Sequence, residues 1–393
     1  MELFNPHSNE WLLNKFEIYK ELRSRDTAYY SEKYQMHVIT RYDDVKFALG
    51  NPDIFSSGKG NLLIEDSIRF NKTLGASDNP RHDIYKNIVK NAYSKDNIDR
   101  IAAAFSDRAR ELLSPVDNLN ISEIIEDLSA TVTAEIINPP IKKQEVKEYV
   151  MHIQRHATGA VSENIDDTML IKFTDLFTDM IVTNKIPSTG PGIYHEYVNN
   201  NSHNFALLPG KLAPSLYIGP AFSGASSLTG SLGILTLDMF RENQIDLVYK
   251  DRTLIPALIN ESLRFHASTG RFSRTVTKDI MLHGVALKEG DRIAVCLESA
   301  NRDPSVFPEP DRFLVHRDTS GQVAFGHGIH ACIALAISKK LMQVWVELLL
   351  EIYGRYKVIT NNCDLKYVMT SSGNNDMISN IIISPEIYTV DSI

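Results

Sequence analysis

The segment from Phe325 to Cys332 constrains this chain more than any other, because it brings one thiol to the end of a loop with two glycines. An apolar stretch with helical periodicity follows, from Ile333 to about Tyr353. A cysteine at a helix N-terminus lies beside unpaired backbone N–H groups and the positive end of the helix dipole, so we expect its pKa to fall. Gly326 and Gly328 permit backbone conformations that a Cβ would forbid, and they let a flat ligand come close. The pattern therefore predicts a thiolate that ligates a metal.

The same segment resembles the haem-binding loop of the cytochrome P450 superfamily, whose pattern is F-x-x-G-x-x-x-C-x-G. It matches at Phe325, Gly328 and Cys332, and it departs at the last position, where Ala334 replaces glycine. The resemblance implies that Cys332 is the axial thiolate ligand of the iron of haem b, with Phe325 and Gly326 also in the cofactor site. For the loop alone, the alternative is a buried structural cysteine.

The bulk composition indicates a globular protein. The chain has 393 residues, of which 43% are hydrophobic and 23% charged, and its net charge is −8. It can bury a sizeable core, and nucleic acid is not the expected partner. The N-terminus has no basic segment followed by an apolar one, and no apolar run approaches about 20 residues, so we expect neither a signal peptide nor a membrane span.

The three cysteines are too few and too irregularly spaced for a disulfide framework, which fits a reducing cytoplasm. We expect Cys296 and Cys363 to be structural or incidental. With the absence of an expected membrane anchor, the resemblance implies the soluble, bacterial type of the family and a cytoplasmic location.

The order of local patterns predicts a mainly α protein with small antiparallel β-sheets, forming a single domain over residues 1–393. Residues 35–40 read as a strand, and Asp43 is a plausible cap of the short helix that follows. Residues 80–240 are mostly helical by periodicity, and residues 270–300 alternate like short strands. The last 35 residues mix turns and strands.

Glu261 and Arg264 match the family's E-x-x-R helix, since residues three apart share one helix face. The resemblance implies that this pair is buried and meets an arginine from a loop before the haem cysteine. Arg312 is our candidate for that arginine and Arg317 is the alternative. The segment from Ala300 to Pro304 matches a phrase typical of bacterial members of the family and supports membership alone.

Four further residues resemble the groups that hold the haem propionates in this family. His82 and Lys86 lie four residues apart at the expected start of a helix, where Lys86 replaces the usual arginine. Arg274 falls in a predicted strand, and His330 precedes Cys332 by two residues. Buried carboxylates need such cationic or hydrogen-bonding partners. A solvated basic helix face is the alternative for the first two.

The family's long central helix usually carries A-G-x-[DE]-T, and here the pattern fails. The corresponding residues are Ser223-Gly224-Ala225-Ser226-Ser227, so Gly224 is kept, Ser226 replaces the acid and Ser227 replaces the threonine. Ser227 keeps a hydroxyl that can hold a water or peroxide. Either a substrate hydroxyl, water or distant carboxylate relays protons in an ordinary monooxygenase, or the enzyme uses peroxide, or cross-links, rearranges or dehydrates its substrate. The serines could also merely pack the helix.

The resemblance implies a haem-thiolate monooxygenase that inserts one oxygen atom from dioxygen into an organic substrate. The segments expected to line the pocket are 55–78, 155–185, 215–227, 266–273 and 372–377. They mix polar and apolar residues, which suits a medium-sized, partly polar substrate such as an intermediate of secondary-metabolite biosynthesis. Examples are Asn61, Leu62, Leu63, Phe222, His266, Phe272, Ser371 and Asn374.

No fused flavin or iron–sulfur segment is recognisable, so the resemblance implies an external redox partner, a ferredoxin with its reductase. Lys86, Lys90, Lys339 and Lys340 could form a basic face that attracts an acidic donor. We expect a monomer. A hypothesis from another class is a non-catalytic haem protein that senses a gas or binds a partner.

Overall fold

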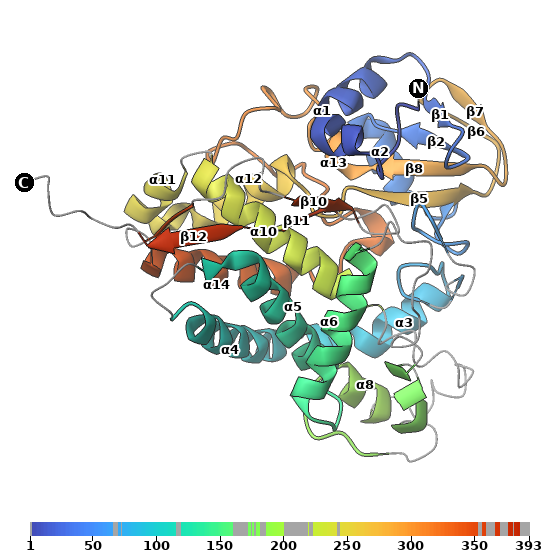
Figure 1. The fold of residues 1–393 in the computed structure, drawn as a ribbon. Helices are drawn as coiled ribbons and strands as arrows, with labels where there is room; N and C mark the ends of the chain where they lie inside the picture. Colours follow the sequence, from blue (N-terminus) through green and yellow to red (C-terminus); the bar gives the residue numbers. More distant parts are fainter. Residues whose placement is uncertain are drawn as a thin grey trace, which may run out of the picture.

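Helices make up most of the computed structural model, and its sheets are small (Figure 1). This confirms the predicted fold class. The structure describes residues 2–65, 70–71, 73–114, 119–159, 186–199, 219, 223–241 and 244–352, with shorter pieces at 172–173, 175–176, 178–180, 356–358, 366–369, 376–379 and 381–385.

The helices that position the site come from all parts of the chain. The described α-helices are α1 (Asn9–Ser24), α2 (Tyr42–Gly50), α3 (Arg81–Val89), α4 (Lys95–Leu112), α5 (Ile121–Ile137), α6 (Lys143–Gly159), α8 (Ile193–Asn199), α10 (Ala225–Arg241), α11 (Ile245–Lys250), α12 (Ile255–Phe265), α13 (Leu297–Ala300) and α14 (Leu335–Ile352). The described 3₁₀ turns are η2 (Lys90–Tyr93), η6 (Arg252–Leu254) and η7 (Gly328–His330). In the part of the chain that is described, no helix is long and apolar enough to cross a membrane.

The strands form a five-stranded sheet and several smaller ones. The described strands are β1 (Tyr29–Ser31), β2 (Met36–Ile39), β3 (Phe55–Ser56), β4 (Leu119–Asn120), β5 (Arg271–Val276), β6 (Ile280–Leu282), β7 (Val285–Leu287), β8 (Arg292–Cys296), β9 (Tyr356–Val358), β10 (Lys366–Met369), β11 (Asp376–Ser379) and β12 (Ile382–Pro385). The largest sheet has the order β1-β2-β8-β5-β3. The smaller sheets pair β6 with β7, β10 with β11, and β12 with both β4 and β9.

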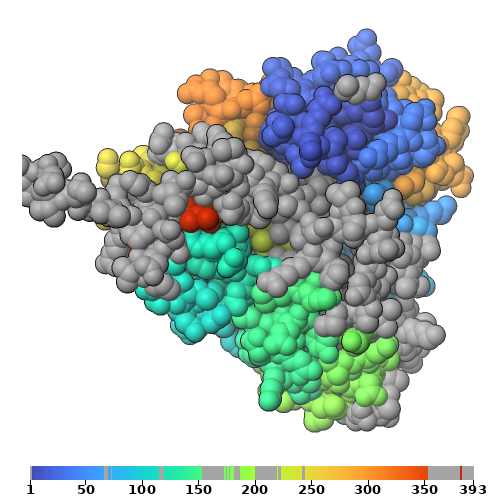
Figure 2. All heavy atoms as spheres, viewed as in Figure 1, coloured from blue at the N-terminus to red at the C-terminus, as the bar shows by residue number. Residues whose placement is uncertain are grey.

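One strand pair differs from the antiparallel pattern that we predicted. β2 and β8 are parallel, with His37 opposite Ile293, and the remaining described pairs are antiparallel. Parallel neighbours need a long crossover connection, and here most of the chain provides it. N-terminal residues and residues near 300 therefore lie side by side at one end of the molecule, where Figure 2 shows blue atoms against orange ones.

The cap that we predicted for α2 is wrong. α2 begins at Tyr42, its N-cap residue is Arg41, and Asp43 lies inside the first turn without a capping hydrogen bond. A distant carboxylate takes this place, since Asp303 Oδ2 accepts the Tyr42 N–H at 2.9 Å. The buried segment 300–303 thus fastens α2 to the sheet region, a contact that local sequence patterns do not reveal.

The main hydrophobic core lies among α4, α5, α10, α12 and α14. Phe105, Leu128, Leu235 and Trp345 are fully buried there. The Trp345 indole N–H donates a hydrogen bond to the Thr236 hydroxyl at 2.9 Å, so this large ring is buried without an unpaired donor. This core fixes α14, and with it the loop that carries Cys332.

Candidate functional site

The loop around Cys332 is closed by its own backbone and by its glycines. The Cys332 N–H donates to the Phe325 carbonyl at 2.9 Å. Gly326 and Gly328 have φ values of 73° and 75°, in the left-handed region that favours glycine. A Cβ at Gly328 would lie 2.6 Å from the Leu49 carbonyl oxygen, so no side chain fits there. The two glycines are therefore required by the path of the loop.

The expected fall in the pKa of Cys332 is wrong for the protein alone. α14 begins at Leu335, so the thiol lies three residues before the helix and outside its first turn. Desolvation raises the pKa of the Cys332 thiol, although a hydrogen bond from the Ala334 backbone acts in the opposite direction. A metal that binds such a thiol must displace its proton.

Cys332 lies among exposed residues of its own chain segment. Cys332 is exposed, and so are Ala331, Ala336 and Leu335. The thiol is nevertheless desolvated by the protein around it. A desolvated thiol in a segment that exposes alanine and leucine side chains is suited to a flat apolar group with a metal at its centre. The described residues include no cluster of three or more His, Cys, Asp or Glu that could hold a metal ion by itself.

Two buried donors near this loop have no acidic hydrogen-bond partner among the described residues. Arg274 on β5 is 4% exposed, and its hydrogen bond goes to the Ser273 carbonyl. Burial lowers the pKa of Arg274 to about 10. The His330 Nε2 atom is buried without a hydrogen bond, and burial lowers the pKa of His330. Such buried donors fit the carboxylates of haem, since burial of an uncompensated cation is costly.

The structure brings the other two predicted propionate residues close to His330. The rings of His82 and His330 meet edge to face with centroids 4.6 Å apart. Lys86 Nζ donates to the Ile329 carbonyl at 3.4 Å. His82 is 2% exposed, and Lys86 is half-buried. α3 therefore contacts the loop that carries Cys332, which is more than a solvated basic face would do.

The E-x-x-R pair is fully buried and bidentate. Arg264 Nε and Nη2 donate to the two carboxylate oxygens of Glu261 at 2.7 and 2.8 Å. The remaining Arg264 N–H groups donate to the carbonyls of Asn301, Pro310 and Arg312. The pair thus fastens α12 to the loop that precedes Cys332 in the chain.

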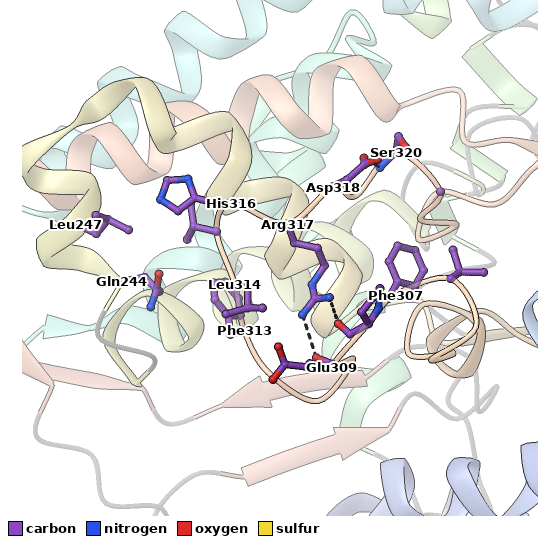
Figure 3. Close-up of a pocket in the computed structure, with 14 residues that line it drawn as sticks. Gln244, Leu247, Phe307, Glu309, Phe313, Leu314, His316, Arg317, Asp318 and Ser320 are labelled. Atoms are coloured by element: carbon purple, nitrogen blue, oxygen red, sulfur yellow. Dashed lines mark hydrogen bonds between the residues drawn. The ribbon is translucent and has the colours of Figure 1, made fainter.

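The choice of Arg312 as the third member is wrong, and Arg317 takes that place. Arg317 Nε donates to Glu261 Oε1 at 3.2 Å, and its side chain is only 6% exposed. Arg312 points outward, pairs with Glu309, and offers only its carbonyl to Arg264. Figure 3 shows Arg317 turned back into its own loop, toward the backbone of Pro308 and Glu309.

The pocket in Figure 3 is a separate feature of the surface. It measures about 700 Å³ and lies between α11 and the loop of residues 306–321. None of the predicted cofactor residues lines it.

The serine pair on α10 lies opposite the segment that follows α12. Ser227 Oγ is 3.3 Å from Thr269 Oγ1, and Ser226 is buried with 3% exposure. Gly224 belongs to a short π-helical turn directly before α10; such turns often mark functional sites. The Ser268 hydroxyl donates to the Ser227 carbonyl at 3.1 Å.

Three contributors escaped the sequence analysis. Asp78 is 3.9 Å from His330, Thr269 contacts Ser227, and Ser268 braces α10. Asp78 lies four residues before His82, but only the fold shows its contacts. Of the pocket residues that we expected, Phe222, Ser371 and Asn374 lie outside the described residues, as does Cys363. Cys296 is buried, where burial raises its thiol pKa to about 12.

Comparisons with known proteins point to one family. A family model described as Cytochrome P450 matches residues 241–362. Pulcherriminic acid synthase of Bacillus subtilis is 24% identical over 381 residues, which cover 89% of this chain and 91% of the relative. Cytochrome P450-terp of a Pseudomonas species is 25% identical over 366 residues, which cover 83% of this chain and 85% of that relative.

Solved structures agree in fold. P450BioI in complex with an acyl carrier protein aligns with a TM-score of 0.84 at 18% identity, over 96% of this chain and 100% of that one. CYP109Q5 from Chondromyces apiculatus aligns with a TM-score of 0.83 at 20% identity, over 97% of each chain.

Proposed function

The chain belongs to the cytochrome P450 superfamily, and from this premise we propose that Cys332 is its axial haem ligand. The protein is an oxidoreductase, a haem-thiolate monooxygenase with haem b as cofactor. One observation carries the assignment of Cys332: an accessible thiol on a glycine-shaped loop, with the buried donors Arg274 and His330 close by. Cys296 is a poor candidate because it is fully buried in β8.

The remaining cofactor residues follow from their chemistry. Arg274 and His330 would donate to the propionates, and His82 and Lys86 would support them from α3. Phe325 is half-buried against the main core, and its carbonyl holds the Cys332 N–H. Gly326 allows the turn that brings these two residues together. Lysine is a point charge without arginine's bidentate fork, and here Lys86 also has a backbone carbonyl to satisfy.

Haem, when bound, supplies the reductive activation of dioxygen. The protein must orient the substrate, exclude bulk water and hold protons near the reacting oxygen. Ser227 and Thr269 are the hydroxyls suited to hold such a proton, since a hydroxyl both donates and accepts. Gly224 and Ser226 would shape the same stretch of α10.

A second candidate chemistry rests on the missing acid of that stretch. Peroxide-dependent oxidation, cross-linking, rearrangement or dehydration would not need the usual acid–threonine pair. Ser226 cannot supply a carboxylate, which favours this alternative. The retained hydroxyl of Ser227 and its contact with Thr269 favour the ordinary monooxygenase.

We propose a medium-sized, partly polar substrate, such as an intermediate of secondary-metabolite biosynthesis. Relatives named pulcherriminic acid synthase and cyclomarin C epoxidase, which act by name on defined organic compounds, support this class. The described parts of the expected pocket segments contain both polar and apolar side chains. Examples are the buried Asn61 and the half-buried His266 and Phe272. Electrons would come from an external ferredoxin and its reductase.

Isotopically labelled dioxygen tests this function. With a surrogate ferredoxin and reductase, a monooxygenase places one labelled atom in the product for each turnover. Label absent from the product, with turnover supported by added peroxide alone, would favour the second chemistry. No turnover of any substrate, despite normal haem content, would favour a non-catalytic haem protein.

A further inference from the structure

Asp78 lies just before α3, and both of its carboxylate oxygens are used by one short loop. Oδ1 accepts the Ser57 N–H at 2.9 Å, while Oδ2 accepts the Gly58 N–H at 3.1 Å and the Ser56 hydroxyl. Desolvation opposes ionisation, but the nearby His330 ring and the hydrogen bonds from residues 56–58 lower the pKa of Asp78 to about 2. Asp78 is therefore a charged acceptor for residues 56–58.

The loop is pressed closely against this carboxylate. A Cβ at Gly58 would lie 2.9 Å from Asp78 Oδ2 and equally close to Asn71 Oδ1. Such distances leave no room for a side chain unless the carboxylate moves. Residues 56–58 include the end of β3, which pairs with β5, the strand that carries Arg274. Asp78 thus connects α3, this loop and the strand of Arg274.

Asp78 lies close to the two donors of the cofactor site but does not satisfy them. His330 Nε2 is 3.9 Å from Asp78 Oδ1, which is an ion-pair distance and too long for a hydrogen bond. Burial lowers the pKa of Arg274, and the charge of Asp78 acts in the opposite direction. No carboxylate of a described residue lies within ion-pair distance of the Arg274 guanidinium. The oxygens of Asp78 are already committed to residues 56–58.

We infer that Asp78 is a positioning residue of the cofactor site. It holds residues 56–58 beside α3, and its charge attracts the His330 ring. Because its oxygens are already hydrogen-bonded, it leaves His330 and Arg274 available to the carboxylates of the cofactor. The inference rests on the proposed haem site and adds a residue that acts through the residues around it.

The rate of haem transfer to a haem-free globin acceptor tests this role. Loss of a charged hydrogen-bond acceptor corresponds to about a ten- to hundredfold change in an equilibrium, so we expect Asp78→Ala to speed haem transfer by a factor of that order. Asp83→Ala is the matched control, because Asp83 is a nearby carboxylate on α3, is exposed and contacts only His82 in the site. It should stay within about twofold of the native protein, as surface changes usually do.

A double-mutant cycle separates positioning from a general loss of stability. If Asp78 acts through His330, the combined Asp78→Ala and His330→Ala variant loses haem more slowly than the two single effects predict together. Additive effects, or an unchanged rate in Asp78→Ala, overturn the inference.

A milder variant keeps the test valid where Asp78→Ala does not fold. Asp78→Asn retains one acceptor oxygen and should give a rate between those of the native and alanine proteins. Slower haem transfer in Asp78→Asn than in the native protein would show that the charge of Asp78 repels the cofactor, and it would also overturn the inference. The thiolate absorption of each carbon monoxide complex is recorded separately, and its absence in the native protein counts against Cys332 rather than Asp78.

Discussion

Glu261 accepts more hydrogen bonds than the simple E-x-x-R pattern implies. Besides the two N–H groups of Arg264, its Oε1 accepts the Leu314 N–H at 2.8 Å and Arg317 Nε at 3.2 Å. Glu261 and Arg264 are both fully buried, so each charge depends on its partner. The network is therefore structural and holds the chain segment that leads to Cys332.

Loss of Arg264 should be far more damaging than loss of Arg312. Removing one partner of a buried pair costs about 3–5 kcal/mol of unfolding free energy, because the other charge stays buried. Arg317→Ala should cost about 1–3 kcal/mol, since the buried Glu261 carboxylate loses one charged donor and keeps the others. Arg312→Ala should stay within about 0.5 kcal/mol. Chemical denaturation of the three variants measures these values, and equal losses for Arg317→Ala and Arg312→Ala would contradict the geometry.

The sequence was sufficient to predict the glycine loop before Cys332 and the buried E-x-x-R pair, because each is a short pattern with a local physical reason. The role of Cys332 as the ligand stays a prediction. It was not sufficient to choose between Arg312 and Arg317. Both precede the cysteine in the same loop, and only the loop's path decides which one reaches Glu261. The pKa of Cys332 was also mispredicted, since it depends on where α14 begins and on desolvation by distant segments.

At the scale of elements, α10 is braced by the segment that follows α12. Ser231 Oγ and Ser268 Oγ are 2.9 Å apart, one turn beyond the contact between Ser227 and Thr269. Farther along, Asp238 accepts the Ser262 hydroxyl at 2.7 Å and contacts His266 Nδ1 at 2.9 Å. These polar contacts join α10 to α12 and to the segment after it, and they keep the α10 hydroxyls in register with Thr269.

Ser227→Ala should uncouple the reaction: reductant is still consumed, but more of its electrons reduce dioxygen to hydrogen peroxide and fewer lead to product. A well-placed general acid typically raises the rate about 10²–10⁴-fold. The neighbouring Ser226 has no carboxyl group that could take over from the lost hydroxyl. We expect Thr269→Val to uncouple in the same direction, because it removes the neighbouring hydroxyl and keeps the shape. Ser231→Ala is the control, as it loses a brace but no hydroxyl of this pair.

Peroxide formed per reductant consumed measures this coupling. Full coupling of Ser227→Ala with every substrate tested would remove Ser227 from oxygen chemistry and favour the second candidate. Uncoupling of Ser227→Ala only with analogues that lack a hydroxyl would instead show that the substrate relays the proton.

At the scale of the whole molecule, several positive charges lie near one loop although the protein is negatively charged overall. The protein carries −8 overall, yet Lys86, Lys90, Lys339 and Lys340 occur on the helices that flank the Cys332 loop. Lys90 is exposed and the other three are half-buried, and desolvation lowers the pKa of Lys339. A local basic face on an acidic protein would steer an acidic electron donor.

Electron transfer from an acidic ferredoxin should therefore slow as salt rises, because exposed charges are screened within about 10 Å at 0.1 M salt. Lys90→Glu should lower the rate at low salt and flatten its salt dependence. Lys278→Glu changes the net charge equally on an exposed turn after β5 and should change the rate little. Equal effects of the two variants in stopped-flow reduction would show that only net charge matters.

The general architecture followed from periodicity and turn signals, since long apolar-periodic segments gave the helices and alternating residues near 270–300 gave strands. The parallel pairing of β2 with β8 did not, because it joins segments at opposite ends of the chain. The capping of α2 by Asp303 has the same cause. That the whole chain forms one domain stays a prediction.

The most direct test of the account is the absorption spectrum of the reduced, carbon monoxide-bound protein in single cysteine variants. The native protein and Cys296→Ser should show the band at the wavelength that names the family, and Cys332→Ser should lose it. Cys296→Ser is a matched control because it makes the same replacement of sulfur by oxygen at a cysteine in the buried strand β8. A band that survives in Cys332→Ser, or disappears in Cys296→Ser alone, would contradict the central claim that Cys332 is the thiolate ligand.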